Sequence, residues 1–77
     1  MPRFFFDIFD GESLWVDDEG TEHATLDAAR REAVETLTQI SRESFAPGKA
    51  VLISIDIRPE QGVAVERVTI ALAFPKP

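Results

Sequence analysis

Residues 50–58 read AVLISIDIR, and this stretch decides the fold. Its side chains alternate in character with a period of two, which is typical of a strand whose two faces meet different surroundings. The predicted inward face consists of Val51, Ile53, Ile55 and Ile57. The predicted outward face carries Leu52, Ser54, Asp56 and Arg58. A strand with so apolar a face must pack against another element.

The opening of the chain predicts a hairpin. Residues 3–9, RFFFDIF, are aromatic and β-branched and suit a strand. Alternation places Phe4, Phe6 and Ile8 on one face and Phe5, Asp7 and Phe9 on the other. Asp10-Gly11 is a turn signal, residues 13–16 return as a strand, and Gly20 is suited to a positive φ. The hairpin register decides whether Leu14 and Val16 or Trp15 point inward, and both alternatives stay open.

An amphipathic helix is expected over residues 26–45. Thr25 fits the N-cap position, and Asp27 in the first turn suits the helix dipole. Pro47-Gly48 ends the helix. At 100° per residue, one sector collects the predicted buried stripe of Leu26, Ala29, Ala33, Leu37, Ile40 and Ser44.

A last strand is expected over residues 64–74, after a turn at 59–62. Val63 and Val65 have the opposite phase to Val68 and Ile70. Either a bulge near Glu66-Arg67 reconciles the phases, or the loop runs to Glu66. The element order is then β-β-α-β-β. We predict one α+β domain over residues 1–77, with one amphipathic helix packed on one face of a four-stranded antiparallel sheet.

The composition is that of a small globular domain. The chain has 77 residues, of which 44% are hydrophobic and 29% charged, and it has no cysteine. Disulfides and thiolate metal sites are therefore excluded. No apolar run approaches the ~20 residues of a membrane span, and the opening lacks the pattern of a signal peptide. We expect a cytoplasmic protein with no membrane association.

The charge is concentrated at the start of the chain. Residues 1–22 hold seven of the 14 acidic side chains and a single basic one, Arg3. Phosphate would be repelled there, and the other basic residues form no stripe, so direct nucleic-acid binding is disfavoured. Asp17, Asp18, Glu19 and Glu22 form a solvated turn, a docking surface for a basic partner, or a divalent cation site. The calcium-loop spacing is not met, which argues against the third reading.

The sequence offers little catalytic chemistry. His23 is the only histidine and is expected at the solvated surface. No serine sits in a nucleophile elbow, and the four glycines never cluster into a phosphate-binding loop. Trp15 suits a core or interface position better than a ligand platform. We therefore expect a non-enzyme with no catalytic residue, no metal and no cofactor.

One helix covers only one face of a sheet, so the other face should expose apolar side chains. That face would present Phe5, Phe9, Trp15 and Leu52, which we interpret as an interface for a homodimer or another protein partner. The alternative is that the aromatic rings fold back over the monomer.

Two resemblances add to this interpretation. The opening MPRFFFDI with Asp10-Gly11, the segment DDEGTE at 17–22 and L-x-x-A-R-x-E-A at 26–33 resemble a family of short alphaproteobacterial proteins of unknown function. The segment 59–66 is longer than that family's pattern. More loosely, the hairpin, acidic-Gly turn and L-x-x-A helix resemble the N-terminal domain of HicB-type antitoxins, and the DNA-binding segment that often follows that domain is not expected here.

The hypothesis is a small acidic protein-interaction module that associates with itself or with a protein partner through the helix-free sheet face. The alternative is a HicB-like antitoxin or nucleic-acid-mimicking inhibitor, whose acidic hairpin would occupy a basic partner. Salt should weaken the second kind of complex steeply and the first kind little.

Overall fold

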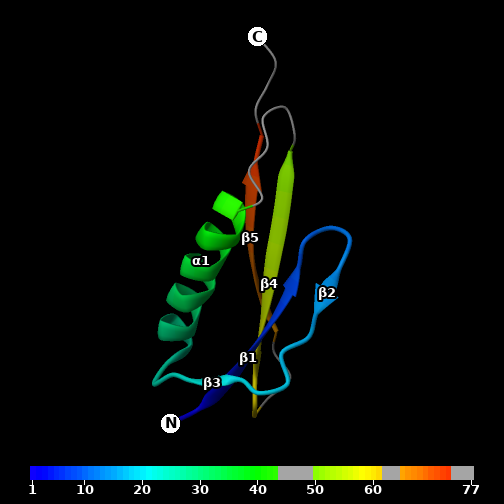
Figure 1. The fold of residues 1–77 in the computed structure, drawn as a ribbon. Coiled ribbons are helices and arrows are strands. Elements are labelled where there is room, and N and C mark those ends of the chain that lie inside the picture. The colour runs from blue at the N-terminus through cyan, green and yellow to red at the C-terminus, as the bar shows by residue number, and fades with distance from the viewer. Residues whose placement is uncertain (44–49, 62–64, 74–77) are drawn as a thin grey trace.

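A helix and an antiparallel sheet form two layers in the computed structural model, which describes residues 1–43, 50–61 and 65–73 (Figure 1). The elements are β1 (Arg3–Phe9), β2 (Leu14–Trp15), β3 (Thr21–Glu22), α1 (Leu26–Glu43), β4 (Val51–Pro59) and β5 (Glu66–Leu72). The strands lie in the order β2-β1-β4-β5, and β3 also pairs with β1. The α+β fold, with one helix packed on an antiparallel sheet, is confirmed.

The returning strand of the first hairpin is split in two. β2 pairs with the end of β1 through Phe9 and Leu14, and β3 pairs with its start through Phe4 and Thr21. The sequence predicted strand only at 13–16, so β3 is an addition. The turn between β1 and β2 is held by the Asp10 side chain, whose Oδ1 accepts the N–H groups of Glu12 and Ser13.

β4 is the central strand and supplies most of the core. Ile55 lies opposite Ile8 of β1 on one side and opposite Val68 of β5 on the other. Ile53, Ile55 and Ile57 are almost fully buried, so the predicted inward face is confirmed at these three positions. The side chain of Val51 lies outside the described part of the structure.

The helix approaches the sheet through small side chains. Thr25 caps it as predicted, because its Oγ1 accepts the Ala28 N–H at 3.1 Å. The buried row is Ala29, Ala33, Leu37 and Ser41, spaced four residues apart. Leu26, predicted to be buried, is 37% exposed because it begins the helix. The predicted helix end at 45, with Ser44 and Pro47-Gly48, lies outside the described residues.

The helix covers the sheet unevenly. It packs over β4 and β5, and Figure 1 shows it beside these strands, away from β2. Phe6 and Ile8 of β1 are consequently only half-buried on the helix side. β5 begins at Glu66, which agrees with the alternative in which the loop runs to Glu66 and no bulge is needed. Residues 62–64 and 74, which belong to the predicted loop and strand, lie outside the described residues.

Candidate functional site

The sheet face that the helix leaves open carries an apolar corner, defined here as Phe9, Leu14, Leu52 and Ala71. Phe9 lies opposite Leu14 of β2, and Leu52 lies opposite Ala71 of β5. Phe9, Leu14 and Leu52 are 42%, 60% and 58% exposed. Because paired residues of antiparallel strands share a face, these side chains lie together at one end of the sheet.

Two of the four predicted interface residues lie elsewhere or are partly covered. Trp15 pairs with Ile8 and therefore points to the helix side, where it borders a hollow with Ile8 and Ile40. The open question of the hairpin register is thus settled, and Leu14 stands on the open face in place of Trp15. Phe5 is half-buried, with the Arg58 guanidinium 5.0 Å from its ring centre. The alternative of a ring covered within the monomer fits Phe5.

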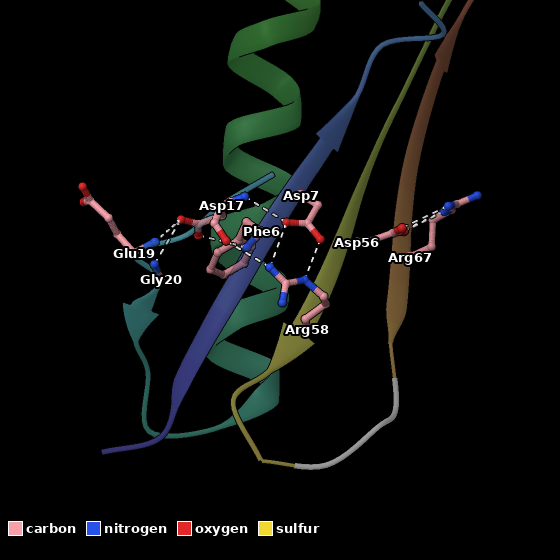
Figure 2. Close-up of polar contacts among 8 residues, drawn as sticks. All are labelled: Phe6, Asp7, Asp17, Glu19, Gly20, Asp56, Arg58 and Arg67. Carbon is pink, nitrogen blue, oxygen red and sulfur yellow. Dashed lines mark hydrogen bonds and ion pairs between the residues drawn. The ribbon is translucent and has the colours of Figure 1, made fainter. Parts of the chain in front are cut away.

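A polar network fills the middle of the open face (Figure 2). Arg58 Nε donates to Asp7 Oδ2 at 2.6 Å, and its Nη2 donates to Asp7 Oδ1 at 3.2 Å. The same Nη2 donates to the Asp17 carbonyl at 3.0 Å, and the Asp17 N–H donates to Asp7 Oδ1 at 2.9 Å. The hydrogen bond to Asp7 raises the pKa of Arg58, so the guanidinium stays charged. This network ties β1, β4 and the segment after β2 together.

The Asp17 side chain completes the edge of β1 where β2 and β3 are interrupted. Its Oδ2 accepts the Phe6 N–H at 3.1 Å, as a strand carbonyl would. Its Oδ1 accepts the N–H groups of Glu19 and Gly20 at 3.1 and 3.0 Å. Burial opposes ionisation, but the N–H groups of Gly20, Phe6 and Glu19 and the charge of Arg58 outweigh it, so the pKa of Asp17 lies below its usual value.

The predicted acidic docking set is therefore not uniform. Asp17 is turned inward by its three accepted hydrogen bonds. Glu22 Oε1 lies 3.5 Å from Arg3 Nη2. Exposed ion pairs of this kind contribute little to the stability of the fold. Asp18 and the Glu19 side chain are exposed. An acidic docking role for these residues stays a prediction.

Further pairs continue the polar network toward β5. Arg67 donates to both oxygens of Asp56, at 2.7 and 3.0 Å. The hydrogen bond from Arg67 lowers the pKa of Asp56. Ser54 and Thr69 hydroxyls lie 2.9 Å apart in the next row. The charges at the middle of the face are thus matched within the chain, while its apolar corner is not covered by the described residues.

His23 was expected at the solvated surface from the sequence, and the structure shows that this prediction is wrong. Its side chain is 17% exposed and sits beside the rings of Phe4 and Phe6, with ring centres 6.3 and 6.0 Å away. Its Nε2 is 3.3 Å from Glu32 Oε1 of the helix. The His23 backbone N–H donates to the Pro2 carbonyl, which continues the pairing of β3 with β1 by one residue pair.

Another hollow, of ≈ 580 Å³, lies at the N-terminal end of the helix. Its ionisable lining residues are Glu66 and Arg67, which are paired with Arg30 and Asp56 respectively. Within residues 1–43, 50–61 and 65–73, no three acidic or histidine side chains converge as metal ligands would. The described part of the chain also contains no helix with the length and apolarity to cross a bilayer.

Comparison with family models gives a match over residues 3–71, to the family described as "Domain of unknown function (DUF6894)". The chain belongs to this family. The predicted resemblance to a family of unknown function is confirmed, and the match includes β1 to β4 and α1 in full and β5 up to residue 71. Neither the curated proteins nor the solved structures contain a match. The looser likeness to the HicB-type antitoxin domain stays a prediction.

For this member of the DUF6894 family, the sequence left Leu14 open as the alternative to Trp15 on the open face, and it gave no sign of the pairing of Asp7 with Arg58. Strand alternation already placed both charged residues on the open face. Only the register, with Phe5 opposite Arg58 and Asp7 opposite Asp56, brings the guanidinium within reach of Asp7. The role of Asp17 had no local signal, because its partner N–H belongs to a strand residue 11 positions earlier.

Proposed function

We propose that the chain is a protein-interaction module that binds a protein partner through the apolar corner of its open sheet face. The observation that carries the proposal is the grouping of three exposed large apolar side chains, Phe9, Leu14 and Leu52, on neighbouring strands. Apolar groups that gather on one surface, rimmed by polar residues, mark interaction sites more often than scattered ones do.

The surroundings of the corner support a selective interface. The ion pairs between Asp7 and Arg58 and between Asp56 and Arg67 lie beside it on the same face. Their charges are already matched within the chain, so a partner covering the rim would not leave an unpaired charge buried. The aromatic ring of Phe9 at the centre is the kind of side chain that anchors interfaces.

The test compares two variants that each add one negative charge. Leu52→Glu places the charge in the apolar corner, and Gln39→Glu places it on an exposed position of the helix. Each tagged chain is expressed in its native cells, purified at moderate salt and analysed by mass spectrometry, and its fold is checked by circular dichroism.

We expect a stoichiometric protein that copurifies with the original chain and with Gln39→Glu but is lost with Leu52→Glu. Retention of that protein by a folded Leu52→Glu chain would contradict the proposal. Loss of the protein with rising salt, together with retention by Leu52→Glu, would instead favour the acidic-hairpin inhibitor.

A further inference from the structure

β5 forms an edge of the sheet that the described residues leave unpaired. The opposite edge, along β1, is covered by both β2 and β3, whereas among the described strands β5 pairs only with β4. Alternate residues of β5 therefore direct their N–H and C=O groups away from the sheet. Such edges template the addition of another strand unless charges, proline or a covering element prevent it.

The usual protection of an edge strand is weak in β5. The strand reads ERVTIAL and has no proline or lysine. Its two charged side chains are drawn to partners in the same chain, Glu66 to Arg30 at 2.7 Å and Arg67 to Asp56 at 2.7 Å. They consequently offer little free charge to repel an incoming strand.

An exposed apolar side chain of the helix lies beside this edge. Arg30 faces β5, because its Nε bonds Glu66, while Glu32 on the other flank faces His23. Val34 follows Arg30 by one turn and is 51% exposed. Arg30, Arg31, Val34 and Glu35 line a shallow hollow on this flank, and Figure 1 shows α1 running beside β5.

We propose that two copies of the chain form a symmetric dimer through β5 and this flank of α1, so that their sheets join into one. Antiparallel pairing of β5 with its copy, centred on Val68, keeps helix-side residues opposite helix-side residues. Val34 lies four residues beyond Arg30, about 6 Å along the helix axis. Val68 lies two strand residues beyond Glu66, about 6.8 Å. The two-fold axis through Val68 therefore also passes close to Val34.

The spacing of the two layers agrees with this arrangement. The helix lies over β4 and β5, so its axis is about half a strand spacing inside β5, and β5 is about half a strand spacing from the two-fold axis. The two helix axes would be about 10 Å apart, which is within the range of packed helices. Val34 would meet its copy between them.

The charges of the helix flank are self-complementary about the same axis. Arg31 stands three residues before Val34, and Glu35 stands one residue after it. The two-fold axis reverses this order, so Arg31 of one copy lies within about 3 Å, along the helix axis, of Glu35 of the other. Arg31 is available for this contact, since its side chain is 81% exposed and its pair with Asp27 is long, at 3.7 Å. This dimer is independent of the proposed partner, but it places two apolar corners on the same side.

Sedimentation equilibrium over a concentration series tests the dimer with charge-reversed chains. We expect the original chain to give the dimer mass, and Arg31→Glu and Glu35→Arg each to raise the dissociation constant about tenfold or more, because two crosswise contacts become repulsive. An equimolar mixture of the two variants should recover the original dissociation constant, since both crosswise contacts then join opposite charges. Pairing within one helix cannot produce that recovery.

Gln39→Glu serves as the control for an added charge and should leave the dimer intact. A monomeric original chain, variants that dimerise like it, or a mixture no tighter than its components would each overturn the inference. A dimer broken by Leu52→Glu and not by Arg31→Glu would overturn it too, because the copies would then meet through the open face. Leu52→Glu should lose the copurifying protein and still give the dimer mass, because the proposed partner site and the dimer contacts lie on different surfaces.

Discussion

Replacing Asp17 with asparagine tests the most unusual local feature of the fold, a side chain that stands in for a strand. In the structure, Oδ1 accepts two N–H groups and Oδ2 accepts the Phe6 N–H of β1. An asparagine amide has one acceptor oxygen and one donor nitrogen. It can keep the bonds to the loop N–H groups of Glu19 and Gly20, but it then turns an NH₂ group toward the Phe6 N–H.

The cost follows from the groups that lose a partner. A part-buried N–H left without an acceptor costs about 1–3 kcal/mol, and the attraction between Asp17 and the nearby guanidinium of Arg58 is lost as well. We expect Asp17→Asn to lower the free energy of unfolding by about 2 kcal/mol at pH 7. For a domain of this size, that corresponds to a fall in Tm of about 8–16 °C.

Thermal unfolding followed by circular dichroism measures the effect. Asp18→Asn is the matched control, because it makes the same chemical change at an exposed neighbouring position. Its free energy of unfolding should stay within about 0.5 kcal/mol of the original chain. Equal Tm values for Asp17→Asn and Asp18→Asn would refute the assignment of Asp17 as the acceptor that completes the edge of β1.

Three further predictions concern stability. The pKa values of Asp17, Asp10 and Asp56 lie below the usual value, so the folded chain binds fewer protons than the unfolded chain at acidic pH. The stability that these carboxylates contribute is fully present above about pH 4 and is lost as the pH falls further. Urea unfolding at pH 7 and at pH 3 measures this loss, and an equal free energy of unfolding at both pH values would contradict the prediction. Leu37→Ala should cost about 2–4 kcal/mol in urea unfolding, because Leu37 is 2% exposed beneath the helix, and a cost below about 1 kcal/mol would mean that the helix does not pack as described. Gly20→Ala should destabilise more than Gly11→Ala in thermal unfolding, since both have positive φ but a Cβ at residue 20 would stand 2.9–3.0 Å from atoms of β1, whereas at residue 11 it meets nothing within 4 Å; the reverse order would contradict the turn geometry.

The layered fold could be predicted because its signals are periodic and strong. The isoleucines at alternate positions of β4 identified the buried face, and the four-residue spacing of Ala29, Ala33 and Leu37 identified the helix side that meets it. Both patterns follow from the geometry of a strand and a helix alone, without knowledge of what packs where.

The candidate site could not be predicted as fully, because it depends on register and on the path of the chain. Leu14 and Trp15 exchange faces with a slip of one residue, and the Asp10-Gly11 signal does not fix that slip. The contact of Asp17 with the Phe6 N–H arises only after the strand is interrupted. Polar neighbours in sequence suggested a solvated His23, whereas its backbone pairs beside the start of β1 and its ring lies next to two aromatic rings of that strand.

Site-specific photocrosslinking in the native cells tests the central claim, that the apolar corner is a protein-binding surface. A photoreactive amino acid replaces Leu52, which is 58% exposed in the corner, and in a second chain it replaces the exposed helix residue Gln39. We predict one discrete crosslinked adduct with another protein from position 52 and none from position 39. No adduct from position 52, or the same adducts from both positions, would contradict the account.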